Sequence, residues 1–487
     1  MSKNGKKDGI LRYERVLLVN PYYLGRGGLR PPLNIGTLAQ ILRSAGIDYD
    51  VLDMTIGYGK RQLARKIAYY KPDLVAISMM TYSYLKIYEL ISFIKRNFAS
   101  IEIIVGGPHI STFREEALRD CPGIDYGWVY ECENGLVDFC EGKNLNEIKG
   151  LLYREGENIV YTQDNPFLKN LDDFHFPRYE KFQMDRYQKE IDISTSRGCP
   201  FPCIFCPVAN SSGKIVRYRS AENVLAELEY WYSNGYRRFA IADDNFTLNR
   251  KRALRILDLI YEAKFKNTVF RAATGVRADL LDEEILEKMK KAGFRHISIA
   301  VESASNKVLS NMKKQETIEE IERAVRLSCD MGFDIILFFI VGSIGETYED
   351  FLKSIDFARR YPVLNALFHN MTPYPKTGMY DWVKNNAVML ADYPEYLNRK
   401  DRGEDHLRPL FYTEDFTFKE RTKALRMRKK VSSEILKKSL RRKLKRFGML
   451  APCLAYLGSI YSIYDIIINT KMTRRIAEKF IYPAEKN

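Results

Sequence analysis

The chain alternates strand-like and helix-like segments in two long series, and this pattern constrains its fold more than any other feature. The apolar run Arg15–Asn20 is typical of a strand buried on both faces of a parallel sheet, and a helical pattern follows at Ile35–Gly46. Strand–helix alternation predicts a doubly wound sheet, with ligands at the carboxyl ends of the strands. The first series spans residues 14–150 and the second spans 191–378, so we expect two α/β domains.

The second series suits a partial (β/α)6 barrel, whose chemistry would sit in the loops that follow the strands. Its strands are expected at residues 191–195, 238–242, 269–274, 296–301, 334–341 and 366–371. Residues 151–190 form a connector in this interpretation, starting with a hairpin around Gly156. Residues 1–13 are polar and are expected to be flexible.

Three cysteines, Cys199, Cys203 and Cys206, follow the first strand of the second series with C-x3-C-x2-C spacing. Thiolates select soft metals, above all zinc and iron–sulfur clusters. A zinc site would need a fourth ligand at short spacing, and neither His175 nor His296 lies at one. A disulfide framework does not suit a long chain with eight irregularly spaced cysteines. Three thiolates would leave one iron of a cubane cluster open for a small ligand.

The cysteine run, with the aromatic Phe205 before its last cysteine, resembles the CxxxCxΦC motif of radical S-adenosylmethionine (SAM) enzymes. The resemblance implies a [4Fe–4S] cluster whose open iron binds SAM and whose electron cleaves it to a 5′-deoxyadenosyl radical. It also implies SAM contacts from the loops after the later strands. The implied SAM-binding residues are Phe205, Asp243, Asp244, Arg277, Glu302, Gly345 and Glu346. Each acidic residue, taken singly, fits a helix N-cap equally well.

The first series resembles the cobalamin-binding domain that precedes many radical SAM barrels, through the runs at 19–21, 31–38 and 105–111. Two features depart from that family. The D-x-H-x-x-G motif that supplies a cobalt ligand is absent, and the usual Gly-Glu-Gly-Glu turn is replaced at 130–133 by Tyr-Glu-Cys-Glu. A domain that keeps the fold without the cofactor is the alternative. The implied cobalamin-binding residues are Pro32, Gly36, Ser78, Gly106, Gly107 and His109.

The net charge of +15 is concentrated in one segment of the predicted C-terminal helical region, 379–487. Between Arg421 and Phe447 there are thirteen Lys and Arg residues and one Glu, which accounts for +12 of the total. An uncharged run, Met449–Tyr464, follows, and it is too short and interrupted to span a membrane. The pattern favours an interfacial tail, with basic groups on anionic headgroups and apolar groups below them. The alternatives are a tail that packs on the barrel and RNA binding, for which the sequence holds no motif.

Together these observations predict an α/β radical SAM enzyme with a Rossmann-like cobalamin domain, which methylates a lipid- or isoprenoid-like substrate at an unactivated carbon. One alternative is ring or C–C bond formation without methyl transfer, and another is a non-enzymatic cluster protein on membrane or RNA. The expected partners are a small-molecule or lipid substrate and an electron donor such as flavodoxin or ferredoxin; nucleic acid is not expected. With no secretory signal in the sequence, we expect a cytoplasmic location, peripheral to the inner face of the membrane.

Overall fold

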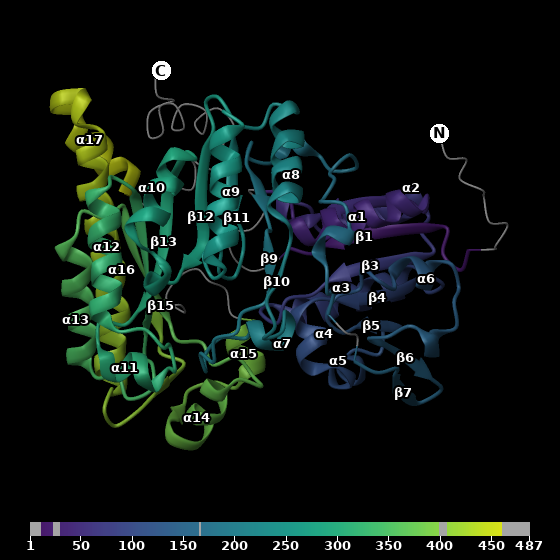
Figure 1. Cartoon of the computed structure of the whole chain (residues 1–487). Coiled ribbons are helices and arrows are strands. Elements are labelled where there is room, and N and C mark those ends of the chain that lie inside the picture. Colours follow the sequence, from purple (N-terminus) through teal and green to yellow (C-terminus); the bar gives the residue numbers. More distant parts are fainter. Residues whose placement is uncertain (1–10, 23–29, 165–166, 399–406, 460–487) are drawn as a thin grey trace. The chain divides into compact units, whose positions relative to one another are not determined.

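The computed structural model describes residues 11–22, 30–164, 167–398 and 407–459, which belong to two compact units (Figure 1). One unit runs to Gln188 and also takes in Val208–Gly213 and the segment that starts at Pro394, and the other contains the rest. The predicted flexible terminus up to residue 10 and the tail beyond residue 459 lie outside the described residues. Within the described ranges, no helix is long and apolar enough to cross a membrane.

The N-terminal unit is built on a seven-stranded sheet with the order β2-β1-β3-β4-β5-β6-β7. The pairs from β2 to β5 are parallel, whereas β6 and β7 are antiparallel additions. The strand order reverses between β1 and β3, which is where doubly wound sheets bind ligands. The strands are β1 Arg15–Asn20, β2 Asp48–Asp53, β3 Leu74–Ser78, β4 Glu102–Gly106, β5 Tyr126–Trp128, β6 Leu151–Glu155 and β7 Asn158–Tyr161.

Local chemistry sets the end of the first helix of the N-terminal unit. Gly46 stops α1 in the left-handed conformation, with a φ of 72°. The hairpin expected around Gly156 is the β6–β7 pair, and it extends the same sheet. The helices are α1 Leu33–Ala45, α2 Lys60–Tyr70, α3 Tyr84–Asn97, α4 Pro108–Phe113, α5 Glu115–Asp120, α6 Leu136–Cys140 and α7 Val208–Ser211.

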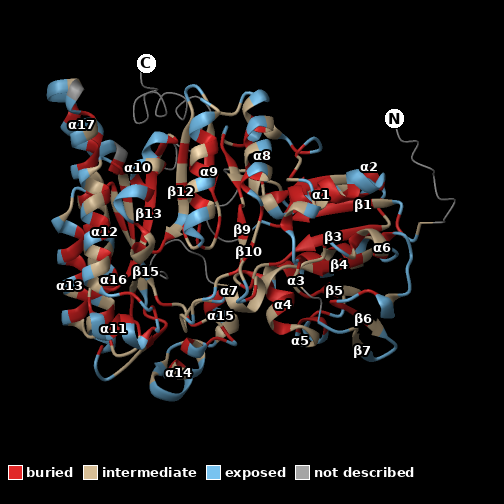
Figure 2. Cartoon of the chain, viewed as in Figure 1, coloured by how far each residue is buried: buried red, intermediate tan, exposed pale blue. Residues whose placement is uncertain are grey.

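The second unit contains a six-stranded parallel sheet in the sequential order β8-β11-β12-β13-β14-β15, as a partial barrel requires. All six strands lie where the apolar runs predicted them. Figure 2 shows their buried residues against the exposed outer faces of the surrounding helices. The strands are β8 Ile191–Ile193, β11 Arg238–Ile241, β12 Val269–Val276, β13 Phe294–Glu302, β14 Asp334–Val341 and β15 Asn365–Asn370.

Capping boxes start two of the barrel helices, since Thr317 pairs with Glu320 at α12 and Thr347 pairs with Asp350 at α13. Two short pairs lie outside the barrel sheet: β9 Ser196–Arg197 with β10 Arg217–Tyr218, and β16 Val388–Met389 with β17 Phe411–Tyr412. The helices are α8 Ala221–Ser233, α9 Arg250–Glu262, α10 Glu283–Lys291, α11 Asn306–Asn311, α12 Ile318–Asp330, α13 Tyr348–Arg360, α14 Gly378–Asn386, α16 Phe418–Lys443 and α17 Ala451–Ser459. The short α15, Tyr393–Leu397, runs into the segment assigned to the N-terminal unit.

The predicted basic helix is present as α16, and one of its faces is an integral part of the barrel. Ser432 donates a hydrogen bond to the carbonyl of Ala366 at 2.6 Å, and Arg428 donates to the carbonyl of Phe368, both on β15. Lys443 forms an ion pair with Asp334 at 2.6 Å. The basic segment is therefore divided between barrel contacts and exposed charges.

Candidate functional site

The cysteine loop begins directly after β8, at the carboxyl end of the first barrel strand. Cys199, Cys203 and Cys206 are all half-buried, and the amide of Cys206 donates to the carbonyl of Cys203 at 3.2 Å. All eight cysteines are among the described residues, and no disulfide joins any of them. In the described part of the chain, no three His, Cys, Asp or Glu side chains meet around a single ion. A cubane makes a different demand, because each of its thiolates binds a different iron.

Two buried cations, Lys314 and Arg277, lie near the cysteine loop. Burial raises the pKa of the Cys199 and Cys203 thiols, and both cations oppose part of that rise. The Arg277 guanidinium lies 3.6 Å from the ring centroid of Phe201 in the loop itself. These cations favour the thiolate form that a cluster requires.

Lys314 is held between two buried carboxylates. Its Nζ lies 3.2 Å from Glu316 and 3.7 Å from Glu302, and all three residues are nearly inaccessible. Burial alone would lower the pKa of Lys314, but Glu302 and Glu316 together raise it, so this amine is charged. Burial raises the pKa of Glu302, and the attraction of Lys314 counteracts that rise.

The backbone around this cluster adopts uncommon conformations. Glu302 has a φ of 63° where β13 bulges against β14, and Lys313 and Gln315 on either side of Lys314 have φ values of 53° and 58°. Arg277 anchors the strained segment by donating to the carbonyls of Lys314 and Gln315, both at 2.7 Å. Strain of this kind persists where surrounding contacts impose it, as they commonly do at functional sites.

Asp243, at the end of β11, holds the start of the cysteine loop. One carboxylate oxygen accepts hydrogen bonds from the amides of Thr195 and Ser196, and the other accepts from both hydroxyl groups. The carboxylate is fully buried, and these bonds engage all of its acceptor positions. We therefore assign Asp243 to loop positioning. Asp244 accepts from the amide of Gly198 at 3.2 Å, next to Cys199.

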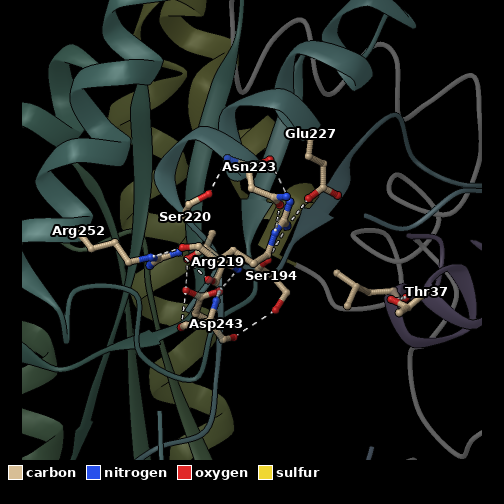
Figure 3. Close-up of polar contacts among 11 residues, drawn as sticks. Thr37, Ser194, Arg219, Ser220, Asn223, Glu227, Asp243 and Arg252 are labelled. Carbon is tan, nitrogen blue, oxygen red and sulfur yellow. Dashed lines mark hydrogen bonds and ion pairs between the residues drawn. The ribbon is translucent and has the colours of Figure 1, made fainter. Parts of the chain in front are cut away.

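Two arginines hold the backbone of Ser194 and Thr195, just before the cysteine loop (Figure 3). Arg252 donates to the carbonyl of Thr195 at 2.6 Å, and Arg219 donates to the carbonyl of Ser194 at 2.8 Å. Arg219 also pairs with the buried Glu227 at 2.5 Å. Because both arginines bind backbone carbonyls, they set the path by which the chain enters the cysteine loop.

Glu346 is buried in the turn that follows β14. Its carboxylate accepts from the amides of Gly342 and Ser343, within the same turn. Burial raises the pKa of Glu346 to about 7, and Arg421 of α16 opposes that rise. The Arg421 guanidinium lies 4.0 Å from the ring centroid of Phe411 and fills the space where a Gly342 side chain would be. Glu346 thus shapes the turn that Gly345 completes.

In the N-terminal unit, small residues mark the carboxyl ends of the neighbouring strands β3 and β4. Ser78 accepts a hydrogen bond from Asn34 at 2.8 Å. Gly107 has a φ of 107°, and a Cβ there would lie 2.8 Å from the carbonyl oxygen of Met79. A Cβ on Gly106 would meet nothing closer than 3.9 Å. This edge presents backbone groups and little side-chain bulk.

Two other predicted cobalamin-binding residues have structural partners of their own. Pro32 is the N-cap of α1. A Cβ on Gly36 would lie 2.3 Å from the ring of Tyr179, so this glycine allows the connector to pack on α1. The Tyr179 ring therefore occupies the space next to Gly36.

His109 lies inside an aromatic cluster. Its ring stacks on Tyr84 at 4.4 Å between centroids, contacts Phe113 at 4.6 Å, and lies 3.0 Å from the Tyr88 hydroxyl through Nε2. Burial lowers the pKa of His109 to about 3, which keeps the ring neutral. The structure thus places His109 in the core beneath α3, consistent with a hydrogen-bonding role.

The segment 130–133, which replaces the usual Gly-Glu-Gly-Glu turn, begins with a strained residue. Tyr130 has a φ of 64°, a conformation that glycine adopts without strain. Its amide donates to Ser111 at 2.9 Å, and its hydroxyl accepts from Arg114 at 3.1 Å. Glu131 accepts from the amide of Leu168 at 2.9 Å, so the turn is fixed by contacts within its own unit.

Several residues at the barrel site were missed from the sequence: Lys314, Glu316, Arg252 and Arg421. Lys314 and Glu316 lie twelve and fourteen residues after Glu302, and no sequence motif predicts their role. The available signal was polar residues between an apolar helix end and the capping box at Thr317. Arg421 was counted with the basic tail, although it is only 1% exposed.

Two family models match the chain. The model of the radical SAM superfamily matches residues 193–358, a range that contains the three cysteines and every predicted SAM-binding residue. The model of the B12 binding domain matches residues 24–139, a range that contains all six predicted cobalamin-binding residues. The order of the two domains is therefore confirmed.

Similar proteins extend these matches across most of the chain. An uncharacterized methyltransferase of Pyrococcus horikoshii is 29% identical over 414 residues, which cover 82% of this chain and 87% of that protein. A protein of Methanocaldococcus jannaschii named as a methylthiotransferase is 30% identical over 338 residues, 66% of this chain and 73% of that protein.

The solved structure of the radical SAM methyltransferase TsrM from Kitasatospora setae, with cobalamin and a [4Fe–4S] cluster bound, has the same fold. Its TM-score is 0.67 at 22% identity, over 75% of this chain and 77% of that one. The likeness supports the parallel sheets of both units.

The matches assign three cofactors to the chain: a [4Fe–4S] cluster, SAM and cobalamin. The residues fit them. The barrel offers three thiols on one loop beside two cations, and the N-terminal sheet offers an edge lined by the backbone of Gly106 and Gly107. That edge lies beside the reversal of strand order between β1 and β3.

Proposed function

Since the chain belongs to the radical SAM superfamily and carries a B12 binding domain ahead of its barrel, we propose that it methylates an unactivated carbon of a lipid- or isoprenoid-like substrate. The observation that carries the proposal is the cysteine loop with the buried Lys314 and Arg277 beside it. When bound, the cluster and SAM supply a carbon-centred radical, and cobalamin supplies a methyl group.

Within this proposal the barrel residues have distinct roles. Cys199, Cys203 and Cys206 hold the cluster, and Phe205 stacks near the adenine of SAM. Lys314 and Arg277 balance the negative charge that three thiolates bring into a half-buried loop. Asp243 and Arg252 fix the loop, so that the thiols keep their spacing.

Three further residues complete the proposed SAM site. Glu302 and Asp244 offer carboxylate oxygens to hydroxyl or amine donors of SAM, because both lie at carboxyl ends of barrel strands. Gly345 offers backbone without a side chain. In the N-terminal unit, Ser78, Gly106 and Gly107 would face cobalamin through hydroxyl and backbone groups.

An apolar substrate is supported by the inner face of β14. Phe339 packs on Phe357 of α13, at 6.3 Å between ring centroids, so it faces the helices. Side chains alternate along a strand, so Phe338 and Ile340 face the interior of the barrel, where both are half-buried. A large apolar residue at each of these positions suits an alkyl chain better than a polar substrate.

We place the reaction at the inner face of the cytoplasmic membrane, with the enzyme peripheral to it and a flavodoxin or ferredoxin as electron donor. The support for membrane association is the exposed apolar surface of α17. The reducing environment of the cytoplasm would also preserve an oxygen-labile cluster.

The test is an anaerobic assay of the reconstituted full chain with SAM, dithionite, a corrinoid and a total lipid extract. We expect 5′-deoxyadenosine and transfer of a deuterated methyl group from labelled SAM into a lipid fraction, measured by mass spectrometry. Cys203→Ser is the control, and it should abolish both products because the cluster loses a ligand.

The other outcomes separate the remaining possibilities. Deoxyadenosine with a new ring or C–C bond, and no labelled methyl group, would replace methyl transfer by radical coupling. No deoxyadenosine from a protein with full iron content would overturn the enzymatic proposal.

A further inference from the structure

Helix α17 packs on the end of α16 through a small apolar cluster. Leu440 of α16 and its C-cap, Leu444, form a cluster with Ala451 and Ala455 of α17, and all four are buried. Leu436 and Phe447 border the cluster. Because α16 is itself hydrogen-bonded to β15, α17 is presented from a fixed support.

The opposite face of α17 and the turn before it are apolar and exposed. The exposed fractions are 98% at Met449, 65% at Leu450, 39% at Leu454, 53% at Tyr456 and 41% at Leu457. Figure 2 shows this exposed stretch at the end of the second unit. A surface helix normally turns its polar residues outward, and contiguous exposed apolar side chains mark an interaction site.

Basic residues border this apolar face. Lys438, Arg441 and Lys445, at the end of α16, are exposed, and Lys437 lies over the ring of Tyr456 at 4.5 Å. The sequence holds no acidic residue between Glu434 and Asp465. Along the sequence, residues 435–464 therefore carry basic groups and no acidic group.

The charge pattern selects the partner. Arg421 and Arg428 of α16 are engaged with the second unit. Near α17, Arg442 and Lys443 also bind barrel groups. Arg441 and Lys445 are exposed, and the exposed Lys438 pairs with Glu434 at 3.1 Å. An apolar face bordered by cations complements the acyl chains and headgroups of an anionic bilayer. The cations could bind RNA phosphates, but the exposed Leu450 and Leu457 side chains would make no favourable contact with RNA.

We propose that Met449, Leu450, Leu454, Tyr456 and Leu457, bordered by Lys438, Arg441 and Lys445, form a docking surface for an anionic lipid bilayer. We call this set the α17 surface. The apolar side chains enter the interfacial region, and the cations lie on the headgroups. The inference deepens the membrane association proposed above. Lipid binding needs neither SAM nor the cluster, so its failure would leave methyl transfer untouched.

The first test is cosedimentation of the full chain with vesicles of phosphatidylglycerol and phosphatidylcholine, compared with phosphatidylcholine alone. We expect binding to the anionic vesicles that falls with added salt. Leu450→Glu with Leu457→Glu should weaken it at least tenfold. The matched control is Tyr69→Glu with Ile215→Glu, because these apolar side chains are 84% and 74% exposed on other surfaces. The control pair should bind like the wild type.

The second test separates local from overall charge. Arg441→Glu with Lys445→Glu should weaken vesicle binding, whereas Lys429→Glu with Lys430→Glu should change it much less. Both pairs reverse two exposed cations of the same chain, and the second pair lies about three turns away along α16. Equal losses from both pairs would indicate nonspecific attraction and would overturn the proposed surface.

The third test addresses other occupants of the surface. A chain that ends at Ser459 should still bind, since the α17 surface is intact in it. Loss of binding in that chain, together with normal binding by Leu450→Glu with Leu457→Glu, would assign the lipid contact to later residues. A dimer in light scattering that these two substitutions dissociate would assign the surface to a second copy. Either result overturns the proposal.

Discussion

The two candidate cofactor sites are built in opposite ways. In the barrel, buried charged side chains lie beside the cysteine loop: Lys314 pairs with Glu302 at 3.7 Å, and Arg277 donates to the carbonyl of Lys314 at 2.7 Å. At the edge of the N-terminal sheet, Gly106 and Gly107 offer backbone and little else. The barrel site depends on the balance of buried charges, whereas the sheet edge depends on the absence of side chains at Gly106 and Gly107. They should therefore respond to different kinds of substitution.

The largest effect is expected from Lys314→Met. It leaves Glu302 buried without its cation, whereas Glu316 keeps Arg277 at 3.7 Å. Removing one partner of a buried ion pair destabilises a protein by about 3–5 kcal/mol. Chemical denaturation of the second unit and iron content after reconstitution should both show the loss. Lys313→Met is the matched control, since this neighbouring lysine is exposed. If Lys314→Met unfolds like the control, charge balance does not govern the barrel site.

Gly107→Ala should affect the N-terminal unit by a different mechanism. The new Cβ would lie 2.8 Å from the Met79 carbonyl at a φ of 107°, and we expect a loss of about 1–3 kcal/mol. Cobalamin binding, followed by its visible absorption, should weaken while SAM cleavage by the barrel persists.

Gly156→Ala is the control for backbone strain without a clash, because its φ is 62° and a Cβ there meets nothing within 4 Å. Equal effects of the two substitutions on cobalamin binding would show that the close approach at Gly107 is irrelevant. Loss of SAM cleavage in Gly107→Ala would break the contrast between the two sites.

The third effect, which is absent at neutral pH, is a difference in acid sensitivity. Burial lowers the pKa of His109 to about 3 in the folded protein, from about 6.5 when unfolded, so the unfolded chain binds the extra proton. Its contribution is present above pH 6.5 and is lost as the pH falls toward 3, by at most about 1.4 kcal/mol per pH unit. His109→Phe should flatten this dependence in thermal unfolding between pH 4 and 6.5. Tyr88→Phe, which keeps the imidazole, should retain the slope.

The second unit contains the comparable His296, whose pKa is lowered to about 4 by burial and partly restored by Asp334 at 3.5 Å. The N-terminal unit should therefore lose stability over the wider acid range. An unchanged slope in His109→Phe would contradict this comparison.

The sequence predicted the fold closely where apolar runs were long. The strand 334–341 has the predicted bounds, because its burial depends on apolar residues within the segment itself. Short elements escaped: β5 has three residues, and its place in the sheet depends on pairing with β4 and β6. The hairpin was found, but its membership of the N-terminal sheet is a tertiary property.

The candidate site was predictable to the extent that its chemistry is local. The cysteine spacing predicted the cluster loop, and the radical SAM match covers it. The roles of Asp243 and Glu346 were not readable, because a carboxylate after a strand can face a ligand or the backbone of its own protein. The role of Lys314 depends on its ion pair with Glu302, and the two residues come together only in the folded chain.

The hydrogen bonds from α16 to β15 bear on how the chain folds during synthesis. An incomplete barrel ends in an edge strand, and exposed strand edges pair with other chains. Arg428 and Ser432 bind two carbonyls of that strand, at Phe368 and Ala366. At about 5–20 residues per second, the ribosome would need several seconds to complete α16 after β15. The nascent barrel would thus pass through an aggregation-prone interval, which ends when its last long helix closes the sheet.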